Sequence, residues 1–333
     1  MSASRASCAI ACCSLLLAPA GCSRARPETG EKTAAAATAS EAVPTQALAS
    51  GSPNADAAAH APSSPDPLLS GEPVRAQSIG HTSYVLELTL SNGSKAVFKP
   101  RSRLPLGDRR YKGEIAAYRL ARALGLDEVP RAVPRSFHAA SLRGAEGFAQ
   151  EALVDPDGRV RGALMPWIDQ YRVLPLESDA WRAKWEPWLT DPRARIPDDQ
   201  RPLAAEISTM IAFDYVTANW DRWSGGNVAK NGATGKVLFV DNDGAFYEFP
   251  PQAALTRQLA LLRRMARFSR GFVRALRGLD ERKLHDVFGE ESPGVPLLPG
   301  PVVAAADARR RTVLALVDAR VSDAGADVTL GFE

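Results

Sequence analysis

The apolar pattern of this 333-residue chain changes once, near residue 168, and that change limits the folds the chain can adopt. Before it, "YVLELTLSNGSKAVFKP" has the pattern of a hairpin, because Asn92-Gly93 is a strong turn signal between two apolar runs. A long helix is expected next at 111–124, with Gly125 closing it. Further strand-like runs follow at 129–137, 147–154 and 161–168.

After residue 168 the pattern is mostly helical. Helices are expected at 201–219, 253–279 and 301–321. The one clear strand of this part, 236–240, delivers Asp241 at its end. Strands followed by helices predict an α+β fold, with a strand-rich N-lobe at 71–168 and a mostly helical C-lobe at 169–333.

All four cysteines lie within the first 22 residues, so the predicted domain has no disulfide and no cysteine nucleophile or ligand. One arginine, a short uncharged apolar run and "LAPAGC" follow the order of a secretory signal, and the run is too short to span a membrane. The ending resembles a bacterial lipobox, although Pro19 stands where leucine is usual. We therefore expect a lipoprotein signal peptide at 1–21 and lipidation of Cys22, with cleavage of a plain signal peptide nearby as the alternative.

Residues 22–70 are rich in alanine, serine and proline and show no repeating apolar face, so they are expected to form a flexible tether. The lipid anchor would hold the protein at the membrane of a bacterial cell envelope, facing the periplasm or the cell surface. The formal net charge of +3 gives no case for a nucleic-acid partner.

Two charged residues of the N-lobe leave two interpretations open. Lys99 ends an apolar strand, where a lysine is often a surface residue with a buried stem. Glu114 shares a helix face with Ala117 and Tyr118, so it should point inward and need a cation. Either Lys99 and Glu114 form an inward pair, or Glu114 is a solvated residue of the first helical turn.

Two acidic clusters flank a Gly-Gly turn, in "NWDRWSGGN" and "VLFVDNDGAF". The first offers Asp221 and Asn227, and the second offers Asp241 and Asp243. Carboxylate and amide oxygens are the ligands that Mg²⁺ or Mn²⁺ takes, usually together with phosphate, and Asp221 could then orient or deprotonate a hydroxyl. Asp214, on an apolar helix face, is expected to fix the loop by accepting backbone N–H bonds. The alternative is a pair of ordinary Asx-rich turns.

The order Lys, Glu, Asp, Asn, Asp in "VFKP", "GEIAAYRLARALGLDEVP" and "DYVTANWDRWSGGN…VLFVDNDGAF" resembles the secretory-pathway kinases of the four-jointed and Golgi casein kinase type. More distantly it resembles HipA-type and phosphoinositide kinases. The resemblance covers roughly residues 75–250 and implies a two-lobed protein-kinase-like fold, with ATP between the lobes near "LMPWIDQY".

The same resemblance implies a role for each matching residue. Lys99 would bind phosphate, and Glu114 would pair with it or help to hold metal. Asp221 would be the catalytic aspartate, and Asp241 and Asn227 would bind the metal. The roles implied for nucleotide binding also include Gly80, which is all that "SIGHTSY" keeps of a glycine-rich phosphate loop.

The resulting hypothesis is a Mg²⁺- or Mn²⁺-dependent enzyme that transfers the γ-phosphoryl group of ATP to a hydroxyl of a protein, sugar or lipid. Asn227 follows Asp221 by six positions rather than five, and the glycine loop is short. ATP is also scarce outside the cytoplasm. Two alternatives therefore stay open: a pseudokinase-type binding module of the cell envelope, or an AMP transferase on the same fold.

Overall fold

The secondary structure follows the predicted division into a strand-rich and a helical part. The computed structural model describes residues 66–80 and 83–333, so the predictions for residues 1–65, including lipidation of Cys22, lie outside the described residues. Its strands are β1 (Pro73–Ser78), β2 (Leu86–Leu90), β3 (Lys95–Pro100), β4 (Val133–His138), β5 (Arg159–Pro166), β6 (Tyr171–Val173), β7 (Val228–Asn231), β8 (Val237–Phe239), β9 (Glu290–Ser292) and β10 (Val295–Pro296). Its α-helices are α1 (Pro67–Ser70), α2 (Arg110–Ala123), α3 (Ala139–Leu142), α4 (Phe148–Glu151), α5 (Asp179–Thr190), α6 (Arg201–Thr217), α7 (Gln252–Arg264), α8 (Arg270–Arg277), α9 (Glu281–Phe288), α10 (Gly300–Ala324) and α11 (Ala326–Thr329).

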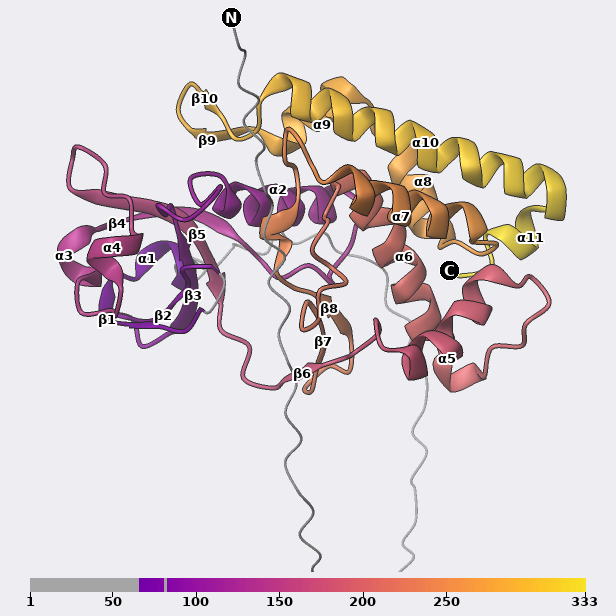
Figure 1. Ribbon diagram of the computed structural model, residues 1–333, viewed down its shortest axis with the longest axis horizontal. Helices are drawn as coiled ribbons and strands as arrows, with labels where there is room; N and C mark the ends of the chain where they lie inside the picture. The colour runs from indigo at the N-terminus through magenta and orange to yellow at the C-terminus, as the bar shows by residue number, and fades with distance from the viewer. Residues whose placement is uncertain (1–65, 81–82) are drawn as a thin grey trace, which may run out of the picture. The chain divides into compact units, whose positions relative to one another are not determined.

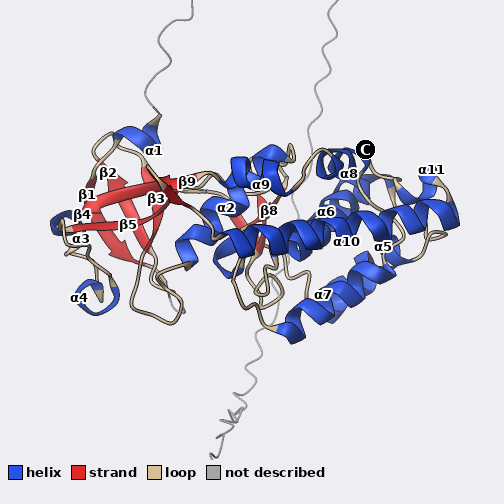
Figure 2. Ribbon diagram, turned by 90° about the horizontal axis from the view of Figure 1, so that it is seen from above, coloured by secondary structure: helices blue, strands red, loops and turns tan. Residues whose placement is uncertain are grey.

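Strands β1 to β5 form one antiparallel sheet in the order β1-β2-β3-β5-β4 (Figure 2). The Asn92-Gly93 turn joins β2 to β3, as the sequence predicts. Neighbouring side chains of a strand point to opposite faces of a sheet. On one face Phe98 packs edge-on against Phe137, with ring centroids 5.1 Å apart. Lys99 therefore lies on the other face.

Helix α2 belongs to the core of the helical part as much as to the sheet. Its Ile115 and Leu120 are fully buried in the same apolar cluster as Ile211 of α6 and Phe288 of α9. The long α10 lies against α6, α8 and α9 (Figure 1). Any shift of α2 would thus disturb both lobes at once.

The strand predicted at 147–154 is wrong, because the chain closes a single helical turn there instead. Gly147 has a left-handed φ of 75°, and the amides of Gln150 and Glu151 donate back to its carbonyl. Sheet-like pairing is limited to the end of the segment, where the Leu153 amide donates to the Arg101 carbonyl.

The single helix predicted at 253–279 is also wrong, since it divides into α7 and α8. Between them the chain turns aside to meet neighbours far away in sequence: the Ala266 amide donates to the Leu189 carbonyl, and the Phe268 amide donates to the Thr329 carbonyl. Ser269 then caps α8 by accepting from the Phe272 amide. Apolar periodicity cannot reveal such a break, because both pieces keep the same helical period.

A second small sheet, β6-β7-β8, adjoins the predicted site. Strand β7 begins directly after Asn227, and β8 ends two residues before Asp241. Pairing of β7 with β8 brings the two acidic clusters together, because Val228 lies opposite Phe239. Among the described residues, no helix is both long and apolar enough to cross a membrane.

Candidate active site

Lys99 is a buried cation that faces three carboxylates. Its Nζ lies 2.5 Å from Glu114 Oε1, 2.5 Å from Asp241 Oδ1 and 3.5 Å from Asp243 Oδ2. Burial would lower the pKa of Lys99, but these carboxylates outweigh it and raise the pKa well above the usual value. Of the two interpretations left open by the sequence, the structure has the inward pair, and Glu114 itself is only 3 % exposed.

Helix α2 reaches this cluster through residues of its first two turns that lie on one face. Arg110 Nη1 lies 3.4 Å from Asp243 Oδ1, and Glu114 contacts Lys99 one turn later. Between them, Gly113 lets the helix touch the loop after β8: an added Cβ would lie 2.7 Å from the Asn242 carbonyl oxygen. A side chain at residue 113 would push the helix away from the loop.

The loop after β8 has an uncommon backbone. Asp241 has a φ of 55°, a left-handed conformation that aspartate tolerates better than most residues. Burial lifts the pKa of Asp243 to about 6 even though Lys99 opposes the change. At Asp241 the pull of Lys99 outweighs burial and lowers the pKa. One carboxylate is thus held ionised beside another that protonates more easily.

The catalytic-loop candidate, residues 219–227, is tied together at Asp221. The Asp221 carbonyl accepts from the Ser224 amide at 3.1 Å and from Asn227 Nδ2 at 2.8 Å. The Asp221 amide donates to Asn219 Oδ1 at 3.3 Å. Because Asn227 uses its Nδ2 on the loop, its side-chain carbonyl oxygen remains available as a ligand.

Arg222 forms a second buried cluster behind this loop. Its Nε lies 3.0 Å from Asp214 Oδ2, and its guanidinium also donates to the carbonyls of Asn227 and Val240 and to Asn242 Oδ1. Asp214 therefore does fix the loop, but its carboxylate accepts from Arg222 rather than from backbone N–H groups, which corrects the expectation. Burial raises the pKa of Asp214 to about 6 against the effect of Arg222.

The carboxylates of Asp221, Asp241 and Asp243 converge in space. Each offers an oxygen that lies within 4.8 Å of the other two. Around them, Lys99 and Arg110 supply two positive charges, whereas these three aspartates and Glu114 supply four negative ones. An excess of negative charge on converging hard oxygens fits a divalent cation such as Mg²⁺ or Mn²⁺.

A cavity of about 650 Å³ opens onto this cluster. Lys99 and Asp241 line it, together with the segment Met165–Ile168 of the predicted hinge-like stretch. Gly80 lines it too, and an added Cβ there would lie 2.0 Å from the Ser83 carbonyl oxygen. The remaining lining residues are Ile79, Ser83, Val85, Val97, Glu114, Pro130, Tyr171, Gly226, Asn227 and Val240.

The structure thus brings Lys99, Glu114, Asp221, Asn227 and Asp241 to one place, with Gly80 across the same cavity. Asp243 was a candidate metal ligand on the sequence alone, whereas Arg110 and Arg222 were given no role there. Arg110 lies one helical turn before Glu114, and this spacing could have indicated that both side chains face the same cluster.

Comparison with known proteins shows the fold alone. No family model matches the chain, and no curated protein matches it either. Solved structures do: a Golgi casein kinase (TM-score 0.57, 16% identity, 78% of this chain and 76% of that one) and hydra Fam20 with sugar (TM-score 0.57, 20% identity, 79% and 89%). A structure of the Golgi casein kinase with Mn/ADP bound matches with the same TM-score, identity and coverage as the Golgi casein kinase above. The chain therefore has the two-lobed α+β kinase-like fold predicted from its sequence.

Proposed function

We propose that this protein is a metal-dependent phosphotransferase that moves the γ-phosphoryl group of ATP to a hydroxyl. The observation that carries the proposal is the buried Lys99, which is bonded to Glu114 and Asp241 and lines a cavity of about 650 Å³. Phosphoryl transfer depends mainly on positioning and charge neutralisation, which this arrangement offers. The kinase-like fold supports it.

The residues present fit a divalent cation, which Asp241, Asp243 and the Asn227 carbonyl oxygen would hold. Bound there, such an ion would neutralise charge on the transferred phosphates. Lys99 would orient the phosphates, held in place by Glu114. The acceptor oxygen would bond to the γ-phosphorus as the bond to the ADP oxygen breaks, and Asp221 would take the hydroxyl proton.

Transfer of label from ATP tests this reaction directly. With Mn²⁺ present, ATP labelled on the γ-phosphate should pass label to the acceptor or to water, and Asp221→Asn should abolish the transfer. Label passing instead from the α-phosphate would identify an AMP transferase. ATP binding without any transfer would identify a binding module, the alternative that the shortened glycine loop suggests.

A groove beside the catalytic loop favours a sugar among the possible acceptors. It holds about 440 Å³ and is lined by Trp185, Trp220 and Trp223, of which the last two flank Asp221 in the chain. Trp185 and Trp223 stack with centroids 5.7 Å apart. Trp220 and Trp223 are partly exposed, and charged side chains line the groove beside them: Glu177, Arg182, Arg257 and Arg264. Aromatic faces beside charged hydrogen-bonding groups suit a ring that carries hydroxyls.

Substitution of two tryptophans can test the nucleotide site and the acceptor groove separately. Trp167 lines the nucleotide cavity, whereas Trp223 lines the groove. Trp223→Ala should raise KM for a sugar acceptor about tenfold and leave KM for ATP unchanged, because about 1.4 kcal/mol of contact is lost at one site only. Trp167→Ala should do the reverse. If a sugar panel is inactive while a protein or lipid is labelled, the sugar assignment is wrong.

We also propose that the protein acts from a lipid anchor at Cys22 in a bacterial cell envelope. The support is the sequence of residues 1–22 alone. Metabolic labelling with a fatty acid tests it: Cys22→Ser should remove the label and release the protein from membranes. Unchanged membrane attachment of this variant would refute the anchor.

A further inference from the structure

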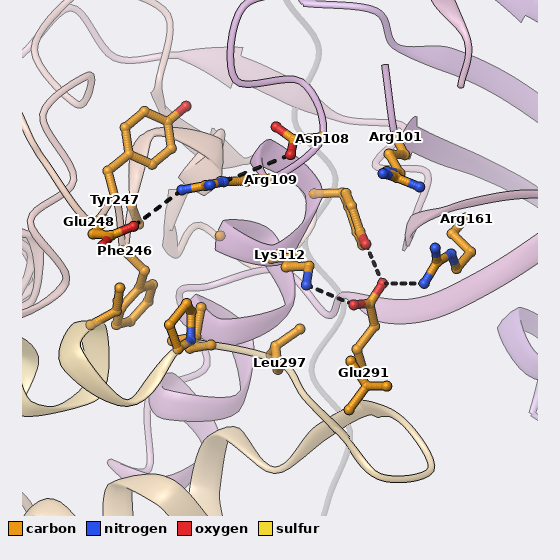
Figure 3. A pocket seen from close by; sticks show the side chains of 17 residues that line it. Arg101, Asp108, Arg109, Lys112, Arg161, Phe246, Tyr247, Glu248, Glu291 and Leu297 are labelled. Carbon is orange, nitrogen blue, oxygen red and sulfur yellow. Dashed lines mark hydrogen bonds and ion pairs between the residues drawn. The ribbon is translucent and has the colours of Figure 1, made fainter. Parts of the chain in front are cut away.

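Glu291 is an acidic residue of the C-terminal region that reaches into the N-lobe. It lies on β9, in the short hairpin formed by β9 and β10, about 180 residues after the helix it contacts. Its carboxylate accepts from the Tyr111 hydroxyl, and lies 2.8 Å from Lys112 Nζ and 3.6 Å from Arg161 Nη1. Figure 3 shows Lys112 and Arg161 converging on Glu291 from two sides.

The Glu291 carboxylate is largely removed from water, with a side chain only 5 % exposed. It also borders a cavity of about 360 Å³, whose lining does not include Lys99 or Glu114. A buried carboxylate is costly unless it is paired and hydrogen-bonded, and here all of the partners come from the N-lobe. The contact is therefore a specific link between the lobes.

A second tie from the same region holds α2 further along. Arg119 donates to the carbonyls of Phe288 and Glu290, the latter at 3.0 Å. Residues 288–291 thus contact the helix at two places, two turns apart. Helix α2 cannot slide or tilt without breaking a charged contact at one of them.

The position of α2 decides whether Glu114 reaches Lys99. Tyr111 and Lys112, which hold Glu291, lie one turn or less before Glu114 in the same helix. We infer that Glu291 is a positioning residue, which holds the first turn of α2 so that Glu114 meets Lys99 in the site. The contact itself is structural, and only its expected effect on catalysis rests on the proposed function.

The same hairpin offers a matched control. Glu290 is exposed, and the one hydrogen bond that its carboxylate accepts within the described part of the chain comes from the Gly294 amide of the same hairpin, at 3.0 Å. Glu290→Gln and Glu291→Gln therefore make the same chemical change at adjacent residues, but only the second changes a side chain that contacts α2. Lys95, exposed on the same strand as Lys99, serves as an internal reference for labelling.

The test is the rate at which an amine-reactive ester labels Lys99 in the protein without ligand, read by mass spectrometry. In Glu291→Gln the Lys99 rate should rise on the order of tenfold, as about 1.4 kcal/mol of lost protection gives, with the Lys95 rate unchanged. In Glu290→Gln both rates should match those of the native protein. Catalysis is then compared in the same variants: kcat for transfer should fall in Glu291→Gln alone.

Three results would overturn the inference: an unchanged Lys99 rate in Glu291→Gln, an equal rise at Lys95, which would indicate general loosening, or the same rise in Glu290→Gln. Because labelling needs no nucleotide, it separates this inference from the proposed function. If native protein transfers no phosphate while Lys99 labelling rises as expected, the positioning role stands and the kinase proposal fails.

Discussion

Two buried cations of this molecule, Lys99 and Arg222, lie in clusters of opposite character. Arg222 has one carboxylate partner, Asp214, its other N–H groups donate to carbonyl and amide oxygens, and its side chain is fully buried. Lys99 faces three carboxylates at the edge of a cavity. The first cluster is complete without a ligand, whereas the second carries an excess of negative charge that a cation would relieve.

The difference suggests different roles for the two clusters: the one around Arg222 stabilises the fold, and the one around Lys99 is suited to binding a ligand. A closed, fully bonded network rigidifies residues 219–227 and leaves no group free to bind a ligand. In an open network with excess negative charge the carboxylates repel one another, and binding of a cation reduces this repulsion. We therefore expect changes at Arg222 to affect stability first, and changes around Lys99 to affect ligand binding first.

The largest effect is expected at the closed cluster. Arg222→Met should lower the free energy of unfolding by about 3–5 kcal/mol, because it leaves Asp214 buried without its partner. Urea unfolding at pH 7 measures the change, with Arg222→Lys as a variant that keeps the charge. A loss below about 1 kcal/mol would mean that the two clusters do not differ as described.

A smaller effect is expected where α2 meets the loop after β8. Gly113→Ala gains helix propensity of about 1 kcal/mol but places a Cβ 2.7 Å from the Asn242 carbonyl oxygen, so the net cost should be about 1–2 kcal/mol. Because the helix must move, binding of ATP and Mn²⁺ should weaken as well. Gly144→Ala is the control, since nothing lies near its added Cβ and it should be nearly neutral.

How far these clusters could be predicted from sequence depends on the distance between their members. Lys99 at a strand end and Glu114 on an apolar helix face are fifteen residues apart, and strand-then-helix packing suggests their contact. Asp241 follows from its apolar strand. Glu291 could not be predicted, because its partners lie some 180 residues away in a region without any motif. Arg222 lies in a motif that the sequence shows, but tertiary packing decides which buried groups it contacts.

The smallest effect is a pH dependence at the contact that positions α2. Burial would raise the pKa of Glu291, but its bonds to Lys112 and Tyr111 outweigh this and lower the pKa below the usual 4.5. The stability it contributes is therefore fully present above about pH 4.5 and is lost as the pH falls through the lower folded value. The gap in unfolding free energy between native protein and Glu291→Gln should shrink between pH 6 and about pH 3. A gap that widens toward acid would contradict this assignment.

The most direct test of the open cluster compares unfolding of the purified native protein and Asp241→Asn, with and without ATP and Mn²⁺. At 100 times its dissociation constant, a ligand should add about 2.7 kcal/mol to the native protein. We predict that this gain is metal-dependent and absent in Asp241→Asn, whose unliganded stability stays within about 1 kcal/mol of native because Lys99 keeps Glu114 and Asp243. No gain with nucleotide and metal in the folded native protein would contradict the central claim that the Lys99 cluster is a metal–nucleotide site.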